Sequence, residues 1–247
     1  MAKSQWVTIP QPNPKAAVRL VCVPYVGTGA EVFRRWPNSL HTAIEICAIQ
    51  LPGRGARIRE APFTSMPELI EALAVALGPF LDRPFAIFGH DLGALIGFEL
   101  TRRLRKNSEP QPKHLFVGGR RAPQTPINGP PRYNLPEPEF IAALREMNGI
   151  PEEVLEHPEL LQLMLPLFRA DFELDESYVY RSEPPLDVPI SAWGGLQDED
   201  PTPAEVEGWR EQTAARFNLR MFPGDHFFLH AAQETLINEI TRELIAI

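Results

Sequence analysis

The stretch Gly89-His90-Asp91-Leu92-Gly93 has the spacing of a nucleophile elbow, a sharp turn between a strand and a helix that presents a reactive side chain. The central residue of that motif is commonly serine, and small neighbours let the backbone turn tightly. Here the small residues are present and the centre is Asp91. A carboxylate at this point could attack an electrophile or take a proton from water. Taken alone, the two glycines also fit an ordinary tight turn.

A histidine near the C-terminus offers the base that such chemistry needs. His226 lies in Phe222-Pro223-Gly224-Asp225-His226-Phe227-Phe228, after an apolar run and before aromatic residues that can anchor a helix. Upstream, Trp193-Gly194-Gly195-Leu196-Gln197-Asp198-Glu199-Asp200 supplies carboxylates that could hold the imidazole. The chain order of elbow, acid and histidine is the order that the elbow fold uses. We therefore predict that Asp91 and His226 face each other.

Alternating strands and helices are predicted to position these residues. Short apolar runs alternate with helical patterns, which is the layout of an α/β fold with a mainly parallel sheet and helices on both faces. Two helices matter most: 66–80, which follows a capping pattern at Ser65-x-x-Glu68, and 92–105, which starts directly after the elbow. The predicted strands are 17–24, 45–51, 85–88, 114–118, 188–193 and 218–222. Asp91 and His226 each follow a strand, so we expect both at the C-terminal edge of the sheet.

The segment from about 125 to 183 breaks this alternation. Proline-rich linkers surround helical patterns at roughly 138–148, 151–157 and 158–180. An insertion of this kind between two core strands predicts a helical lid over the site. A helical excursion with no part in binding is the alternative.

Length, composition and charge limit the class of protein. A chain of 247 residues with 44% hydrophobic content fits one domain over 1–247. The net charge of −8 and the lack of a long basic cluster argue against nucleic-acid binding. The densest basic run, 102–106, is interpreted as the end of a helix, and a docking patch for an acidic partner is the alternative. Cys22 and Cys47 lie in apolar runs, so we expect no disulfide, no metal site and a reducing cytoplasm. No signal peptide or membrane span is predicted.

Six stretches spread along the chain form one combined pattern. They are Val23-Pro24-Tyr25-Val26-Gly27, Gln50-Leu51-Pro52-Gly53-Arg54-Gly55, Gly89-His90-Asp91-Leu92-Gly93-Ala94, Gly119-Arg120-Arg121-Ala122-Pro123, Leu165-Pro166-Leu167-Phe168-Arg169-Ala170-Asp171-Phe172 and Gly224-Asp225-His226-Phe227-Phe228. Together they resemble the type II thioesterases, free-standing α/β-hydrolases that serve polyketide synthases and nonribosomal peptide synthetases. The likeness runs over nearly the whole chain.

The resemblance implies an α/β-hydrolase fold and hydrolysis of acyl groups from the phosphopantetheine arm of carrier proteins. The expected partners are acyl or peptidyl carrier domains and a small acyl thioester, in antibiotic biosynthesis. No cofactor of the protein's own is expected, since the substrate arrives on phosphopantetheine. The apolar lid residues favour an apolar acyl chain, although the same stripe would serve as core packing: Leu160, Leu161, Leu163, Met164, Leu165, Leu167 and Phe168.

The resemblance also implies roles for individual residues. Asp91 and His226 would be catalytic, and backbone amides of Val26 and Leu92 would form the oxyanion hole. The acid is Asp198 or Asp200: Asp198 follows the glycine pair Gly194-Gly195 by the interval that the family shows, whereas Asp200 precedes a proline as the family's acid often does. We favour Asp198, and expect Asp225 in a turn.

Two stretches depart from the family pattern. Asp91 stands where the family has the elbow serine, and Tyr25-Val26-Gly27-Thr28 stands where it commonly has histidine and alanine before its glycines. Asp91 could attack a thioester and form a mixed anhydride that water activated by His226 would open, or it could act as a base on water. An engineered aspartate is the less favoured explanation. Since a carboxylate would repel an oxyanion beside it, we expect slower thioester hydrolysis or a different electrophile.

Three functions fit these features. The favoured one is an editing or releasing thioesterase that acts on carrier-bound chains. The second is a diverged enzyme that cyclises, hydrates or dehydrates the tethered chain. The third is a catalytically silent binder of carrier proteins, against which the presence of His226 with its acid argues.

Overall fold

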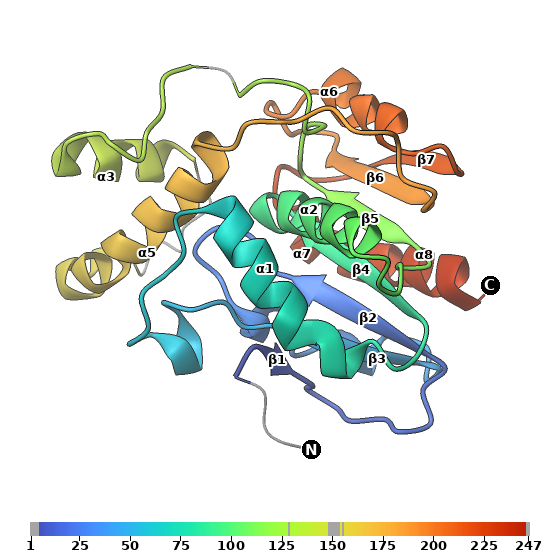
Figure 1. The fold of residues 1–247 in the computed structure, drawn as a ribbon. Coiled ribbons are helices and arrows are strands. Elements are labelled where there is room, and N and C mark those ends of the chain that lie inside the picture. The colour runs from blue at the N-terminus through green and yellow to red at the C-terminus, as the bar shows by residue number, and fades with distance from the viewer. Residues whose placement is uncertain (1–4, 128, 148–153, 155, 246–247) are drawn as a thin grey trace.

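A seven-stranded sheet forms the centre of the computed structural model, which describes residues 5–127, 129–147, 154 and 156–245 (Figure 1). The strand order is β1-β3-β2-β4-β5-β6-β7, and all neighbouring strands run parallel except the pair β1 and β3. The strands are β1 (Val7–Thr8), β2 (Val18–Val23), β3 (Ile44–Ile49), β4 (Phe85–His90), β5 (Leu115–Gly118), β6 (Ile190–Gly195) and β7 (Phe217–Phe222).

Helices cover both faces of the sheet, as the sequence predicts. Alternate strand residues point to opposite faces: Val21 packs with helices α1 and α2, whereas Leu20 packs with α8. The α-helices are α1 (Met66–Leu77), α2 (Leu92–Lys106), α3 (Glu137–Glu146), α5 (Pro158–Glu176), α6 (Pro203–Glu207), α7 (Phe228–Ala231) and α8 (Gln233–Ile245). Short 3-10 helices span Ala30–Phe33, Trp36–Asn38, Gly55–Arg57, Gly78–Phe80 and Gly208–Gln212.

The six predicted strands are confirmed, with ends that differ by at most two residues. Strand β1 was not predicted, because two residues are too few to show a pattern. The helix predicted at 66–80 is α1 followed by a 3-10 turn, but the side chain of Ser65 makes no capping hydrogen bond. Ser65 is therefore the N-cap residue of α1, as the pattern predicts, but its side chain does not form the capping bond. A complete capping box opens α6 instead, where Thr202 and Glu205 bond reciprocally.

The register of the sheet brings five loops to one edge. Val23 lies opposite Gly89, His90 opposite Gly118, and Gly118 opposite Trp193. Gly195 in turn lies opposite Phe222. The parallel strands end level with one another, so the loops that follow β2, β4, β5, β6 and β7 meet there.

The segment expected to form a lid contains α3 and α5, which lie together at one side of the sheet (Figure 1). Most of the helix predicted at 151–157 lies outside the described residues. The stripe on α5 divides: Leu161, Leu165 and Phe168 are buried in a cluster with residues of α3, while Leu160 and Leu163 are exposed. The buried part of the stripe thus serves as core packing, the alternative kept open above.

Two further expectations concern the cysteines and the membrane. Cys22 and Cys47 are both buried and unbridged. Within the described ranges, none of the helices is both long enough and apolar enough to cross a bilayer.

Candidate active site

Asp91 stands on the turn between β4 and α2. Its φ of 51° and ψ of −120° lie in a region that non-glycine residues rarely occupy. Two backbone hydrogen bonds hold it there: its N–H donates to the carbonyl of Gly118 (2.8 Å), and its carbonyl accepts from the N–H of Ala94 (2.9 Å). Strain of this kind is characteristic of functional turns. The structure therefore presents Asp91 as the sequence motif predicts.

The flanking glycines are required by close backbone contacts. A Cβ atom on Gly89 would lie 2.1 Å from the carbonyl oxygen of Gly93, and a Cβ atom on Gly93 would lie 2.3 Å from the carbonyl oxygen of Val23. Neither contact is possible without moving the main chain. The glycine spacing is thus explained by two close approaches, one within the elbow at Gly89 and one between the elbow and the end of β2 at Gly93.

His226 lies in the loop after β7 and is held by Asp198. The two side chains are joined at 3.0 Å between Nδ1 of His226 and Oδ2 of Asp198. The other oxygen of Asp198 accepts the backbone N–H of Asp200 (3.2 Å). Both Asp198 oxygens are therefore occupied, which fixes the imidazole through its Nδ1 side and leaves Nε2 for chemistry.

The other two candidate carboxylates have different partners. Asp200 forms an ion pair with Arg121, and Asp225 accepts the backbone N–H of Phe227 (2.9 Å), as a turn residue does. Of the carboxylates considered from the sequence, Asp198 is the one that bonds to His226.

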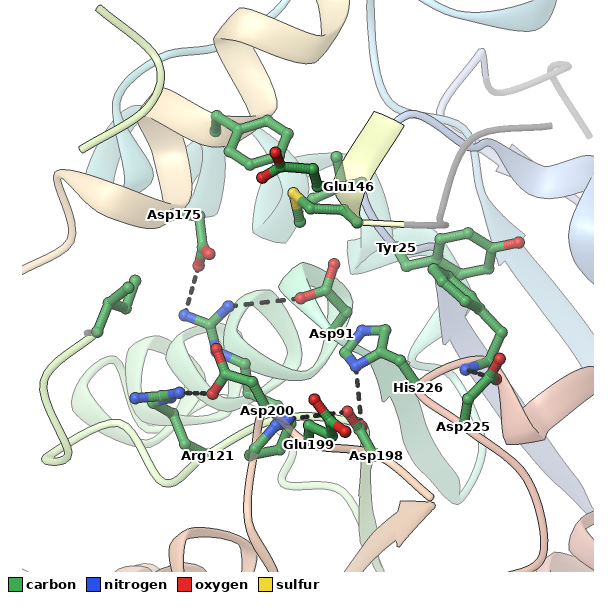
Figure 2. A pocket seen from close by; sticks show the side chains of 18 of the residues that line it. Tyr25, Asp91, Arg121, Glu146, Asp175, Asp198, Glu199, Asp200, Asp225 and His226 are labelled. Atoms are coloured by element: carbon green, nitrogen blue, oxygen red, sulfur yellow. Dashed lines mark hydrogen bonds and ion pairs between the residues drawn. The ribbon is translucent and has the colours of Figure 1, made fainter. Parts of the chain in front are cut away.

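Asp91 and His226 line one cavity of about 540 Å³. Figure 2 shows the His226 ring next to the Asp91 carboxylate, with Asp198 on its far side. Residues from the lid, including Phe172 and Asp175 of α5, form the opposite wall. The cavity also reaches the loops after β2, β5 and β6. It lies between lid and core, and the five loops at the sheet edge surround the reactive groups.

The loop that should supply one oxyanion-hole amide is fastened to the lid. Val26 lines the cavity, and the next residue, Gly27, donates its N–H to Oδ2 of Asp171 on α5 (2.8 Å). Arg54 bonds both oxygens of Asp171, at 2.8 and 2.7 Å. The Asp171 side chain is fully buried and that of Arg54 is 5% exposed. This triad holds the Val26 loop, and sequence spacing could not reveal it, because Arg54 and Asp171 lie 117 residues apart.

Replacing Asp171 with alanine should destabilise the fold by about 3 to 5 kcal/mol, because the substitution leaves the Arg54 charge buried and unpaired. Urea unfolding followed by circular dichroism measures the change. The matched control is the double substitution Asp171→Leu with Arg54→Met. It loses the same bond to Gly27 but leaves no buried charge, so its loss of stability should be clearly smaller. Equal losses in the two variants would contradict the role given to the ion pair.

Arg120 is a site residue to which the sequence assigned no role. It follows β5, and its Nη1 lies 3.6 Å from Oδ1 of Asp91. Its Nη2 forms an ion pair with Asp175 of α5. The stretch Gly119-Arg120-Arg121-Ala122-Pro123 stood out in the sequence. The partners of Arg120 lie on other elements and emerge only from the fold.

Burial and neighbouring charges change the acidity of the two central groups. Burial raises the pKa of Asp91 above its ordinary 3.8, although the charges of His226 and Arg120 act in the opposite direction. Burial alone would lower the pKa of His226, but the hydrogen bond to Asp198 and the charge of Asp91 outweigh it and raise the pKa above 6.5. The carboxylates of Asp91 and Asp198 thus favour the imidazolium form of His226 against the effect of burial.

His90, the second residue of the elbow, is completely buried beneath His226. Its ring lies 5.3 Å from the His226 ring and 5.3 Å from the Phe228 ring, centre to centre. Burial and the nearby His226 charge lower its pKa well below 6.5. His90 is thus a neutral packing residue that supports the His226 loop.

These groups can perform nucleophilic or general-base chemistry. Asp91 needs no base to attack, and an imidazolium at His226 can give a proton to a leaving group. Among the described residues, no group of three or more His, Cys, Asp or Glu side chains is arranged to hold a metal ion. The α2 N-terminus adds the Leu92 amide beside Asp91.

Comparison with known proteins gives consistent matches along the chain. A sequence model described as "Thioesterase domain" matches residues 18–244. The gramicidin S biosynthesis protein GrsT of Aneurinibacillus migulanus is 42% identical over 241 residues, which cover 98% of this chain and 94% of that protein. The solved structure of RedJ, a thioesterase of the prodiginine pathway in Streptomyces coelicolor, superposes with a TM-score of 0.86 at 35% identity over 95% of this chain and 92% of RedJ. The type II thioesterase BorB from the borrelidin cluster gives a TM-score of 0.86 at 32% identity, over 97% and 96%.

Proposed function

The chain belongs to the thioesterase family and has its α/β-hydrolase fold, and on that premise we propose that it hydrolyses acyl chains tethered to carrier-protein phosphopantetheine. The pathway would be polyketide or nonribosomal peptide biosynthesis. This setting is supported by the similarity to GrsT and BorB, whose names refer to gramicidin S biosynthesis and the borrelidin cluster. The partners would be acyl or peptidyl carrier domains, whose arm would enter between lid and core.

One observation carries the proposal: Asp91 on the strained elbow shares a cavity with a histidine that is bonded to a carboxylate. A silent binder would have no physical need for this pairing. The set Asp91, His226 and Asp198 is the proposed catalytic group, with Asp91 in place of the usual elbow serine.

In the nucleophilic route, an oxygen of Asp91 attacks the carbonyl carbon of the thioester. The carbon–sulfur bond breaks, and the sulfur leaves as a thiol with the proton of the His226 imidazolium. Neutral His226 then takes a proton from water, whose oxygen adds to the acyl carbon of the mixed anhydride. The bond between the acyl carbon and Asp91 breaks, so the free acid leaves and the carboxylate is restored. His226 thus works on the leaving group and the water rather than on the nucleophile.

The amide of Leu92 constrains the rate of this reaction. Its N–H lies beside the Asp91 carboxylate and lowers the pKa of that group against the effect of burial. An oxyanion that forms on the substrate would compete for the same donor, leaving the amide of Val26 as the second donor. This competition, together with repulsion from the carboxylate, is a physical reason to expect turnover below that of a serine enzyme.

Incubation with a panel of acyl-carrier-protein thioesters should release free acid and leave the carrier with an unmodified phosphopantetheine thiol. Intact-protein and small-molecule mass spectrometry detect both products. The control is Asp91→Asn protein with the same panel, which corrects for spontaneous hydrolysis. If the chain is rearranged but still tethered to the carrier, the protein is the diverged enzyme described above and not a hydrolase. If all thioesters stay unchanged, the proposal is overturned.

A further inference from the structure

Arg120 lies between two carboxylates that belong to different layers of the molecule. Asp91 stands on the elbow of the core, and Asp175 stands on lid helix α5. Figure 2 shows the two carboxylates on either side of one guanidinium group, with a dashed line to each. The Arg120 side chain is 8% exposed. Its charge is therefore compensated mainly by these two groups rather than by water.

We propose that Arg120 is a positioning residue that holds Asp91 as an oriented carboxylate, and that Asp175 of the lid sets how much of the guanidinium charge reaches Asp91. The proposal rests on the function proposed above, in which Asp91 must be ionised to react. It adds a link between the lid helix and the charge of the reactive group.

The backbone around Arg120 is fixed, so its side chain starts from a defined point. The Arg120 carbonyl accepts the indole N–H of Trp209 (2.9 Å), and the N–H of Gly119 donates to the carbonyl of Trp193 (2.9 Å). The guanidinium thus projects from a rigid turn after β5 toward the lid and the elbow. With that backbone fixed, the orientation of the Arg120 side chain helps to decide how its guanidinium divides between the two acids.

That division is unequal in the structure. The contact with Asp175 is the closer of the two, whereas the 3.6 Å between Arg120 and Asp91 is an ion pair longer than a hydrogen bond. Within the described part of the chain, the buried Nε of Arg120 has no hydrogen-bond partner. Asp175 therefore draws the guanidinium away from Asp91, and its removal would release Arg120 to bond Asp91 directly.

The groups that face Asp91 act on it in opposite directions. Burial and the charge of Asp175 raise its pKa, while His226, Arg120 and the Leu92 amide lower it. Tyr25, from the loop after β2, is a further titratable neighbour, and burial helps to raise its own pKa to about 12, so it stays neutral. Loss of Arg120 should therefore raise the pKa of Asp91, and loss of the Asp175 charge should lower it.

The dependence of kcat/KM on pH tests this proposal, because its acidic limb should shift in opposite directions when Arg120 and when Asp175 are replaced. An ionised Asp91 is present above its pKa, so kcat/KM falls as the pH drops through that value. The limb should move up by about 1 pH unit in Arg120→Met, the lower end of the effect of an adjacent arginine on an aspartate. It should move down in Asp175→Asn. Arg120→Lys, which keeps the charge, should bring the limb back toward that of the unaltered protein.

Arg121→Met is the matched control. Arg121 is also buried and lines the same cavity, but its ion pairs run to Asp200 and Glu205. Its substitution should leave the acidic limb in place. The proposal would be overturned if the acidic limb did not move in either Arg120→Met or Asp175→Asn. It would also be overturned if Arg121→Met shifted the limb as much as Arg120→Met does.

A carbon-13 NMR titration of the Asp91 carboxyl group provides a readout that does not depend on catalysis. The signal is assigned by its absence in Asp91→Asn protein, and its pKa should move in the same directions as the limb. If Asp91→Asn keeps full activity, the catalytic role proposed for Asp91 fails, but the titration still tests Arg120. If Arg120→Met does not fold, the proposal is tested with Asp175→Asn alone, because asparagine keeps the shape of aspartate. An unchanged pKa of Asp91 in that variant would overturn the proposal.

Discussion

Asp91→Asn should greatly reduce turnover while leaving the fold and the cavity intact. Asparagine has nearly the same shape, and it tolerates a positive φ better than most residues, so the strained elbow at φ 51° should persist. Its amide can neither attack a thioester nor accept a proton from water. The loss should be about 10² to 10⁴ in rate, the usual size of a lost general base, and a lost nucleophile should cost no less. Steady-state hydrolysis of an acyl-carrier thioester measures it, with circular dichroism as the check on folding.

Asp91→Ser is the informative partner of that variant. The charge of Asp91 helps to raise the pKa of His226, so its removal should leave a larger share of neutral imidazole near pH 7. Neutral His226 could then take the proton of the serine hydroxyl, as in serine hydrolases. The serine variant should hydrolyse thioesters or divert the reaction to hydrolysis. Full turnover by the asparagine variant would instead make Asp91 a structural feature and leave any chemistry to His226 and the lid.

Local sequence patterns were sufficient to predict the core of the fold. The strands are short apolar runs with clear ends, and the elbow and His226 each follow such a run directly. A parallel sheet brings residues that follow its strands to one edge, whatever their separation in the chain. This is why Asp91 and His226 could be placed together from the sequence, although they are 135 positions apart (226 − 91) in the chain.

The pairings within the site could not be predicted, because they depend on the orientation of side chains from separate loops. Asp198 and Asp200 both follow β6, and only the turn of that loop points one to His226 and the other to Arg121. The ion pair between Arg120 and Asp175 likewise joins a core loop to the lid. No spacing rule connects such positions. The role of the apolar residues on α5 was ambiguous for the same reason, since apolar side chains pack equally well on a substrate or on a neighbouring helix.

Substitution at His226 should cost about as much as substitution at Asp91, because residues that act as one unit are not additive. His226→Ala removes the group proposed to protonate the thiol and activate water, and we expect a loss of about 10² to 10⁴ in rate. The double substitution with Asp91→Asn should lose little more than either single one. Losses that multiply in the double variant would show that the two residues act in separate steps or sites.

The two neighbouring acids provide a matched pair that tests the geometry of the His226 loop. Asp198→Asn leaves Nδ1 of His226 without its carboxylate, so the imidazolium loses the bond and the charge that favour it, and the rate should fall by about 10²-fold or more. Asp200→Asn removes a carboxylate of the same loop that bonds Arg121 instead, so its effect on kcat should be small. The basic limb of the pH profile separates the variants further: the pKa of His226 should fall in Asp198→Asn and stay unchanged in Asp200→Asn. A larger loss of rate in Asp200→Asn than in Asp198→Asn would show that Asp200 is the acid that pairs with His226. The loop after β6 would then have to rearrange in the working enzyme.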